Sequence, residues 1–500
     1  MAPFNVEELT VSSFHTALRQ GDTTCADVLT TYLTRITTHD PTLKALIITN
    51  PSAKATATEK DQETKQLLKN GIPFPPLHGV PILLKDNYTT SDLPTSAGCK
   101  ALQSLTTKFD SEVVSRLRNA GAIIIGKTNL HEFALHGTTT SSLGGQTVNP
   151  YDKSRTPGGS SGGTAAGIAA NFALLGCGTD TMNSCRSPAS ACGVVGFRPS
   201  KGIVPVSGIV PVSSTQDVAG PIGRSVEDVM VLYDVMRGLD VFASRDCGSG
   251  LSGCLTGQGV RIGVLEWYFG FEDAGSATLE GDGDRIRDEN RIVKGIIRDA
   301  LVSVQDELDA TLVPRLGIGG DLLKNADTQP FEFRTCLDTF LSSQDVDSKY
   351  RSLKSIVDAG EYHREAVTDV FTAGLENPKV FCTGSEEYAA RLLVIEALKE
   401  SVKEIFENYH LDALVYPHQR QLPVKVGVTR QPNRNGILAA VTGSPAICIP
   451  AGFTEPTSEA PLGVPVGLEL MGENEEDDDL LYLARGIEKV LSARKAPILS

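Results

Sequence analysis

No stretch of this 500-residue sequence is apolar for long enough to span a bilayer, and its first residues lack the basic segment and apolar run of a signal peptide. Its ten cysteines include no Cys-x-x-Cys pair and its eight histidines show no ligand spacing, so neither a disulfide framework nor a zinc site is indicated. We therefore expect a cytoplasmic protein with no metal, no other cofactor and no membrane partner.

Basic stripes with interleaved aromatic residues are also missing, and the formal net charge is −15. Binding to a phosphate backbone needs a positive surface, so we expect no nucleic-acid partner. The sequence is 40% hydrophobic and 21% charged, which is ordinary for a globular protein that buries a large core.

Short apolar runs bounded by glycine and proline alternate with helical patterns along much of the chain. The runs at 79–86 and 122–126 have the texture of buried strands, and the segment after Thr24 places apolar residues on one helical face, with Asp27 completing a capping pair. Strands that alternate with helices predict an α/β fold with a partly parallel sheet.

The segment "GAIIIGKT", from Gly121 to Thr128, matches the letters of a phosphate-binding loop. Such a loop needs consecutive backbone N–H groups in turn conformations. Three consecutive isoleucines, however, favour a strand and resist such turns. We therefore interpret this segment as a strand and predict no nucleotide binding.

Three features carry candidate chemistry. Lys85 ends an apolar strand, where a lysine is usually ion-paired or reaches solvent, but where a desolvated lysine can act as a base. The loop "TPGGSSGG" at 156–163 holds two serines between glycine pairs, which permit unusual backbone conformations. In the segment 173–197 we expect a strand ending at Gly178, a turn, and a helix from Pro188 that leaves serines near free N–H groups.

In this order, 75 residues separate Lys85 from Ser160 and 24 separate Ser160 from Ser184. Together with "GKTNLHEFALHGTTT", "STQDVAGPIGRSVEDV" and "GSPAICIPAGF", these segments resemble the amidase signature family over the whole chain, most loosely in 242–410. The resemblance implies one large α/β domain with a central twisted mixed β-sheet covered by helices on both faces.

The expected organisation is a single domain, 1–500, in four parts. These are an N-terminal helical region (1–70), a catalytic core (71–241), a variable helical insertion or cap (242–410) and a return to the core sheet (411–500). We expect the substrate pocket to take its walls from the insertion and from the loop His136–Gly145.

The resemblance also implies roles for individual residues. Ser184 is the expected nucleophile, Ser160 the bridging serine after a cis peptide bond, and Lys85 the base. The expected oxyanion hole comprises the backbone N–H groups of Thr181, Met182, Asn183 and Ser184. Many family members have two glycines where this chain has Met182 and Asn183, so we expect these two side chains to contact the substrate.

The implied activity is hydrolysis of a carboxylic amide, or a related ester, through an acyl-enzyme on Ser184, with a small-molecule amide as substrate. One alternative is an acyltransferase or amide-forming enzyme of the same fold. Another is a noncatalytic or partner-dependent subunit, because one branch of the family serves in a transamidase complex. A homodimer is the candidate assembly. Asp180 and Arg186, on either side of the nucleophile, are interpreted as a structural charge pair.

Overall fold

The structure is a computed structural model, and it describes residues 4–239, 259–270, 283–318, 322–323, 325–367 and 369–499. The expected boundary between 241 and 242 lies outside the described residues.

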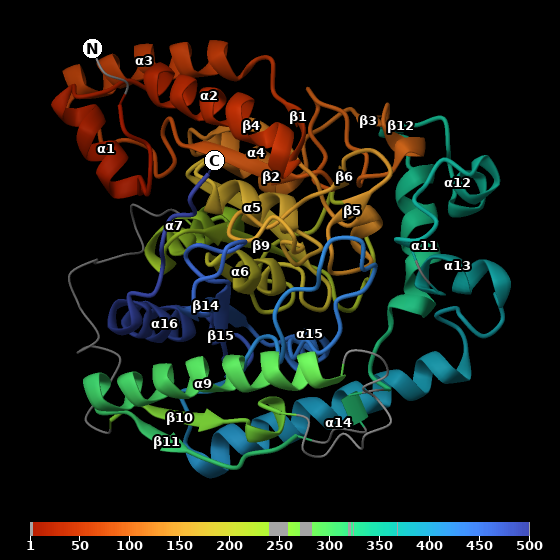
Figure 1. The fold of residues 1–500 in the computed structure, drawn as a ribbon. Coiled ribbons are helices and arrows are strands. Elements are labelled where there is room, and N and C mark those ends of the chain that lie inside the picture. The colour runs from red at the N-terminus through yellow and green to blue at the C-terminus, as the bar shows by residue number, and fades with distance from the viewer. Residues whose placement is uncertain are drawn as a thin grey trace.

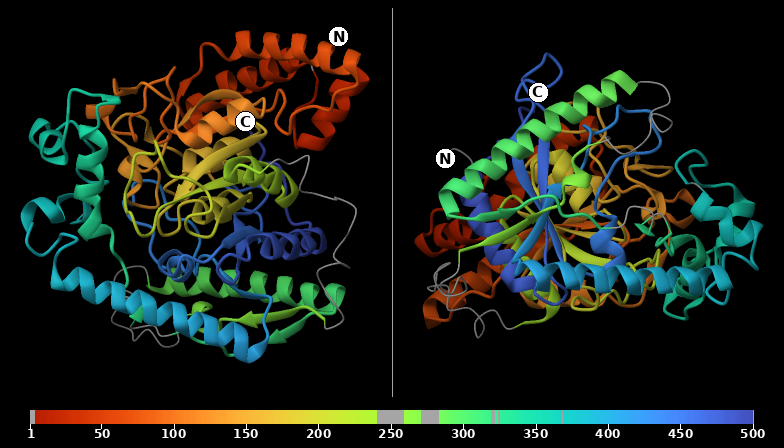
Figure 2. Two further views of the ribbon diagram at one scale, coloured as in Figure 1. Left: turned by 180° about the vertical axis from the view of Figure 1, so that it is seen from behind. Right: turned by 90° about the horizontal axis from the view of Figure 1, so that it is seen from below.

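A twisted sheet of 11 strands runs through the centre of the described molecule (Figures 1 and 2). In spatial order its strands are β1 (Leu46–Thr49), β4 (Ile123–Thr128), β2 (Pro81–Lys85), β7 (Leu175–Asp180), β9 (Val218–Gly223), β8 (Val195–Arg198), β14 (Ala446–Phe453), β15 (Pro465–Met471), β13 (Ala413–Pro417), β10 (Arg261–Val264) and β11 (Thr311–Val313). The neighbours β4, β2 and β7 are parallel, as are β13, β10 and β11, and the remaining pairs are antiparallel. The predicted mixed sheet is confirmed.

Helices cover both faces and both ends of this sheet. They are α1 (Val11–Gln20), α2 (Cys25–Leu43), α3 (Ala53–Asn70), α4 (Glu112–Asn119), α5 (Gly162–Ala169), α6 (Arg186–Cys192), α7 (Val226–Arg237), α9 (Gly283–Leu308), α11 (Gln329–Ser342), α12 (Leu353–Ala359), α13 (Asp369–Glu376), α14 (Glu386–Tyr409), α15 (Ile437–Thr442) and α16 (Asp477–Leu491). Helices α1 to α3 lie together at the β1 end, and α9 and α14 pass on opposite sides of the far end (Figures 1 and 2). None of these described helices combines the length and apolarity needed to cross a membrane.

The remaining described elements are short. They are β3 (Thr106–Thr107) paired with β12 (Val346–Asp347), β5 (Thr140–Ser141) paired with β6 (Gly145–Gln146), and single turns of 3-10 helix at Lys100–Leu102, Glu132–Ala134 and Glu266–Tyr268. Helices α11 to α13 stand beside the sheet (Figure 1) and share a second hydrophobic cluster, in which Phe333, Leu337 and Phe371 pack with Phe133.

Local sequence explains the elements nearest the candidate residues. The Thr24 side chain caps α2 by accepting a hydrogen bond from the backbone N–H of Asp27, as predicted. The run at 122–126 forms the buried strand β4, which extends through Lys127 and Thr128, so the segment with the letters of a phosphate loop is a strand. Strand β2 lies between β4 and β7, parallel to both and buried throughout. The carboxyl ends of β2 and β7 therefore meet at one edge.

Two sequence predictions need correction. Strand β7 does not end at Gly178 but continues to Asp180, because Thr179 and Asp180 pair with Ala219 and Val218 of β9. The following helix, α6, begins at Arg186 and not at Pro188. Prolines are tolerated throughout the first turn of a helix, where N–H groups lack intrahelical acceptors, so Pro188 marks the turn without fixing its first residue.

The region 242–410 is not wholly a helical insertion. Its described part supplies β10 and β11, which extend the central sheet at one edge beside β13. These strands have only four and three residues, too few for an alternating pattern to be distinguished from a loop. The division into four parts otherwise stays a prediction.

Candidate active site

Lys85 lies at the carboxyl end of β2 with no exposed surface. Its Nζ donates a hydrogen bond to Ser160 Oγ at 2.7 Å and another to Thr179 Oγ1 at 2.8 Å. The Thr179 hydroxyl also accepts from Asn87 Nδ2 at 3.0 Å. The lysine is thus held by two hydroxyl groups and directed at Ser160.

No carboxylate forms an ion pair with Lys85 in the described part of the chain, so the ion-paired interpretation of this lysine is wrong. Burial lowers the pKa of Lys85 from 10.5 to about 8, and the nearby charges of Asp180 and Asp217 only partly oppose this. A substantial fraction of Lys85 is therefore neutral just above pH 7 and able to accept a proton.

Ser160 is positioned by a loop that only glycine permits. The Gly159–Ser160 peptide bond is cis, as the resemblance predicts. Gly158 has a φ of +72°, and a Cβ there would lie 2.8 Å from the backbone oxygen of Ser187 in α6. Any side chain would both strain the backbone and separate the loop from α6. The glycines therefore bring Ser160 against the segment that holds Ser184.

Ser184 lies between the end of β7 and the start of α6 and is 6% exposed. Its backbone oxygen accepts a hydrogen bond from the N–H of Ser161 at 3.2 Å. The Ser161 hydroxyl in turn donates to the carbonyl of Thr179 at 3.2 Å. These bonds tie together the three segments that carry Lys85, Ser160 and Ser184. Within the described residues the Ser184 hydroxyl has no hydrogen-bond partner, and catalytic hydrogen bonds are often long until a substrate is bound.

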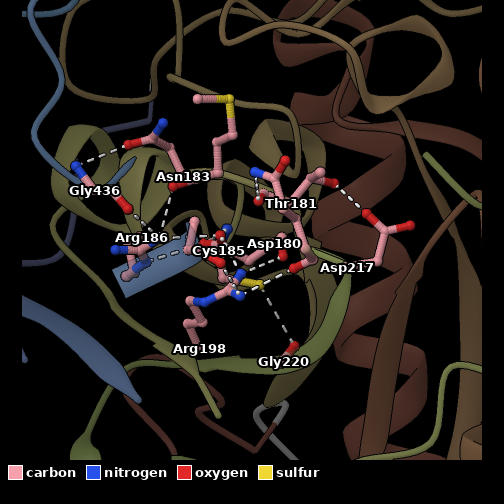
Figure 3. A network of polar contacts seen from close by, with 12 residues as sticks. Asp180, Thr181, Asn183, Cys185, Arg186, Arg198, Asp217, Gly220 and Gly436 are labelled. Carbon is pink, nitrogen blue, oxygen red and sulfur yellow. Dashed lines mark hydrogen bonds and ion pairs between the residues drawn. The ribbon is translucent and has the colours of Figure 1, made fainter. Parts of the chain in front are cut away.

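A buried ion network braces the segment around Ser184 (Figure 3). Asp180 accepts hydrogen bonds from the Cys185 N–H and from Arg186 and Arg198, at 3.0 to 3.2 Å. Burial alone would raise the pKa of Asp180, but the two guanidinium groups hold it well below its usual range. Arg186 also forms an ion pair with Glu469 of β15. The pair of Asp180 and Arg186 is structural, as predicted.

The segment between Asp180 and Cys185 leaves its N–H groups free. Among the described residues, the four consecutive backbone N–H groups from Thr181 to Ser184 donate to no protein acceptor. Buried N–H groups are nearly always paired, so a run of four without partners beside a serine has the character of an anion-binding site. This arrangement agrees with the expected oxyanion hole.

Met182 and Asn183 fit this segment without left-handed backbone conformations. Met182 is partly exposed, and its carbonyl accepts a hydrogen bond from Arg186 at 2.7 Å. Asn183 Oδ1 accepts from the Gly436 N–H at 3.1 Å, as Figure 3 shows. This bond engages the carbonyl oxygen of the Asn183 side chain, whereas its amide nitrogen bonds to no described residue and remains available for the substrate contact that we expected.

Known proteins of similar sequence and structure indicate the family. A family model described as amidase matches residues 27–266. The peptide amidase from Stenotrophomonas maltophilia has a closely similar structure, with a TM-score of 0.81, 28% identity and 100% of both chains covered.

The chain is thus similar to the amidase family. Its similar relatives include a glutamyl-tRNA(Gln) amidotransferase subunit of Microcystis aeruginosa, 28% identical over 97% of this chain and 98% of that protein. Another solved relative is an amidase family protein from Bacillus anthracis, with a TM-score of 0.79, 26% identity, and coverage of 100% of this chain and 96% of that one. The predicted family is confirmed, whereas the roles of individual residues stay predictions.

The protein has a cavity of about 600 Å³ beside the segment that holds Ser184. Asn87, Thr179 and Thr181 line it on the sheet side, and side chains of α11 that include Cys336 and Phe340 line it opposite. Part of the expected wall therefore comes from the region 242–410. The loop His136–Gly145 contributes nothing to this cavity.

The sequence analysis missed two residues of this candidate site. The Thr179 hydroxyl accepts a hydrogen bond from the Lys85 amine, beside the bond that this amine donates to Ser160. Asp217 accepts a hydrogen bond from the Thr181 hydroxyl at 2.6 Å, which fixes the start of the segment Thr181 to Ser184. A signal for Thr179 was present, because Lys85 and Thr179 both end apolar runs that are adjacent parallel strands. Asp217 lies inside the quoted segment "STQDVAGPIGRSVEDV", but nothing in that pattern indicates its partner.

Proposed function

We propose that this protein hydrolyses a carboxylic amide, or a related ester, through an acyl-enzyme on Ser184. The observation that carries the proposal is the Lys85 amine, which is buried, has no carboxylate partner among the described residues and is hydrogen-bonded to Ser160 at 2.7 Å. A buried lysine without a counter-ion is unfavourable for folding, but its lowered pKa suits a general base near neutral pH. The proposed substrate is a small-molecule amide.

In the proposed reaction the Ser184 hydroxyl attacks the amide carbonyl and gives its proton to Ser160, which gives its own proton to neutral Lys85. The tetrahedral intermediate then expels the amine, which takes a proton back from Lys85 through Ser160. Water attacks the resulting Ser184 ester by the same proton path and releases the acid. No histidine is required in this sequence of steps.

The negative charge on the substrate oxygen would be stabilised by the free N–H groups of Thr181 to Ser184. One such donor contributes about 2.7–4 kcal/mol to stabilisation of the transition state. The segment is suited to this task because Asp180, Arg186 and Asp217 hold it from three directions. Such preorganised N–H groups need little rearrangement during the reaction.

A second candidate is a partner-dependent acyl transfer, in which another nucleophile replaces water. It is favoured by the relatives from Microcystis aeruginosa and Zea mays, which are both subunits of glutamyl-tRNA(Gln) amidotransferases, at 28% and 29% identity over at least 96% of this chain. The full-length structural likeness to a peptide amidase favours activity of the chain by itself. The cytoplasmic location and the homodimer stay predictions from the sequence.

The test is labelling with a fluorophosphonate probe, followed by a screen of amides and esters for release of acid and amine. We expect the native protein to be labelled at Ser184, and Ser184→Ala to remove both labelling and hydrolysis. Ser187→Ala is a matched control, because the Ser187 hydroxyl is buried three residues away and has no hydrogen-bond partner among the described residues. Label on Ser160 or Ser161 in the Ser184→Ala protein would contradict the assigned roles, and activity only after addition of a second nucleophile would favour acyl transfer.

A further inference from the structure

Arg434 is a partly exposed arginine on the segment between β13 and α15. In the described part of the chain its guanidinium group forms neither a hydrogen bond nor an ion pair. By contrast, Arg186 and Arg198, the two other arginines near the nucleophile segment, are each paired with Asp180. Arginines that are partly withdrawn from solvent are usually paired with an anion, so the guanidinium group of Arg434 is a candidate binding group.

Contacts of the Arg434 side chain and of the nearby Gly436 link this segment to both serine segments. Two residues further on, Gly436 donates its N–H to Asn183 and accepts a hydrogen bond from Arg186 through its carbonyl at 3.0 Å. The Arg434 guanidinium packs directly on Gly137, where an added Cβ would lie 2.3 Å from Nη1. Gly137 itself packs on Gly159, where an added Cβ would lie 3.0 Å from the Gly137 carbonyl carbon. Gly159 directly precedes Ser160.

The charges around Arg434 are not balanced. Burial lowers the pKa of Arg434 to about 10; Asp180 opposes this shift and Arg186 adds to it. Asp180 already accepts from two arginines, and Glu469 is occupied by Arg186 and His418. Two carboxylates thus serve three guanidinium groups, which leaves one positive charge unmatched. A partly desolvated cation without a partner gains free energy when an anion binds beside it.

We propose that Arg434 is a substrate-binding residue that receives a carboxylate carried by the amide substrate. The inference rests on the proposed function and narrows its substrate class to amides with a free carboxylate group. A single unmatched charge suits a carboxylate, which is a monoanion, better than a phosphate dianion. The planar fork of arginine can also bind both carboxylate oxygens at once, which fixes the orientation of the scissile amide.

The test measures binding by calorimetry to the Ser184→Ala protein, so that turnover does not interfere. Two ligand pairs differ only in charge: succinamate against succinamide, with the carboxylate on the acyl side, and N-acetylglycine against N-acetylglycinamide, with the carboxylate on the amine side. We expect at least one anion to bind more tightly than its neutral partner. Adding Arg434→Gln should weaken binding of that anion roughly 10- to 100-fold and bring the affinity ratio of the pair close to one. Arg434→Lys should restore part of the preference.

Arg298→Gln is the matched control, because it removes the same charge from an exposed position that lines a separate groove beside α9 and β11. Preference for succinamate alone would place the carboxylate on the acyl side, and preference for N-acetylglycine alone would place it on the amine side. The proposal is overturned if neither anion is preferred, if Arg434→Gln weakens both members of a pair equally, or if Arg298→Gln has the same effect. Failure of the native protein to be labelled at Ser184 would count against the proposed function alone, since the binding test does not depend on that labelling.

Discussion

Replacement of Lys85 by methionine should abolish amide hydrolysis and, near pH 7, leave the protein slightly more stable. The pKa of Lys85 lies about 2.5 units below its usual value of 10.5, so burial of the charged amine costs about 3 kcal/mol. Methionine has a similar volume and no charge, but it removes the two hydrogen bonds that the Lys85 amine donates to Ser160 and Thr179, at about 1 kcal/mol each. The net expectation at pH 7 is a gain of about 1 kcal/mol.

The pH dependence makes this prediction sharper. Because the pKa of Lys85 is lower in the folded state, the full cost applies below pH 8, where the amine is charged in both states. As the pH rises from about 8 to 10.5 the folded protein loses the proton first, and the native protein gains stability. The Lys85→Met protein should therefore change from about 1 kcal/mol more stable at pH 7 to about 2 kcal/mol less stable near pH 10.5.

Lys127 provides the matched control. It is equally buried, on the neighbouring strand β4, but its Nζ lies 2.9 Å from Asp86 Oδ1 in an ion pair. Lys127→Met would leave a buried carboxylate without its partner and should cost about 3–5 kcal/mol. Urea-induced unfolding of the three proteins at pH 7 and pH 10 measures both effects. If Lys85→Met destabilises the protein at pH 7 as much as Lys127→Met does, Lys85 is a structural anchor and the reasoning is wrong.

Three further predictions concern the same site. The native kcat/KM for an amide should fall about tenfold per pH unit below pH 8, because Lys85 must be neutral to accept a proton, and a pH-rate profile that is flat between 6 and 8 would contradict this. Asp180→Asn should lower the free energy of unfolding by about 3–5 kcal/mol, since it removes the carboxylate between two buried arginines, and an unchanged urea midpoint would show that the network is dispensable. Glycine at both 182 and 183 should increase hydrolysis of small generic amides if Met182 and Asn183 restrict the substrate; unchanged specificity in an amide screen would remove that role.

The α/β class could be predicted from local sequence, whereas the mixed sheet and the candidate catalytic residues were predicted from the resemblance to the amidase signature family. The apolar run before Lys85 predicts a buried strand from its own residues, without knowledge of its neighbours in the fold. In the same way, the three isoleucines at 123–125 are enough to exclude a phosphate-binding loop. Strands β10 and β11 could not be predicted, because such short segments show no period and are strands only through pairing with β13.

The same reasoning explains the residues that were missed. Thr179 can bind the Lys85 amine only because β2 and β7 are neighbouring strands. Asp217 contributes to the site because it accepts a hydrogen bond from Thr181 on the neighbouring segment. Arg434 lies in a polar segment without periodicity, and its interest comes from the absence of a partner within the described ranges, which no sequence pattern records. Contacts between segments 18 to 250 residues apart decide the chemistry of this site.

The position of α11 bears on how specificity could be exchanged between relatives. Helices α11 to α13 pack with residues of the region 97–212 in the second hydrophobic cluster, and α11 turns one side toward the cavity beside Thr181. The apolar side chains of the strands that hold Lys85 and Thr179 pack in the other cluster, so a change in α11 to α13 does not alter their direct packing. A chimaera that receives the segment 329–376 from another amidase, together with its contacts at Phe133 and Val212, would keep the nucleophile and acquire a different cavity wall. Replacement of these helices would thus change the cavity wall while the segment that holds Ser184 keeps its contacts with Asp180, Arg186 and Asp217.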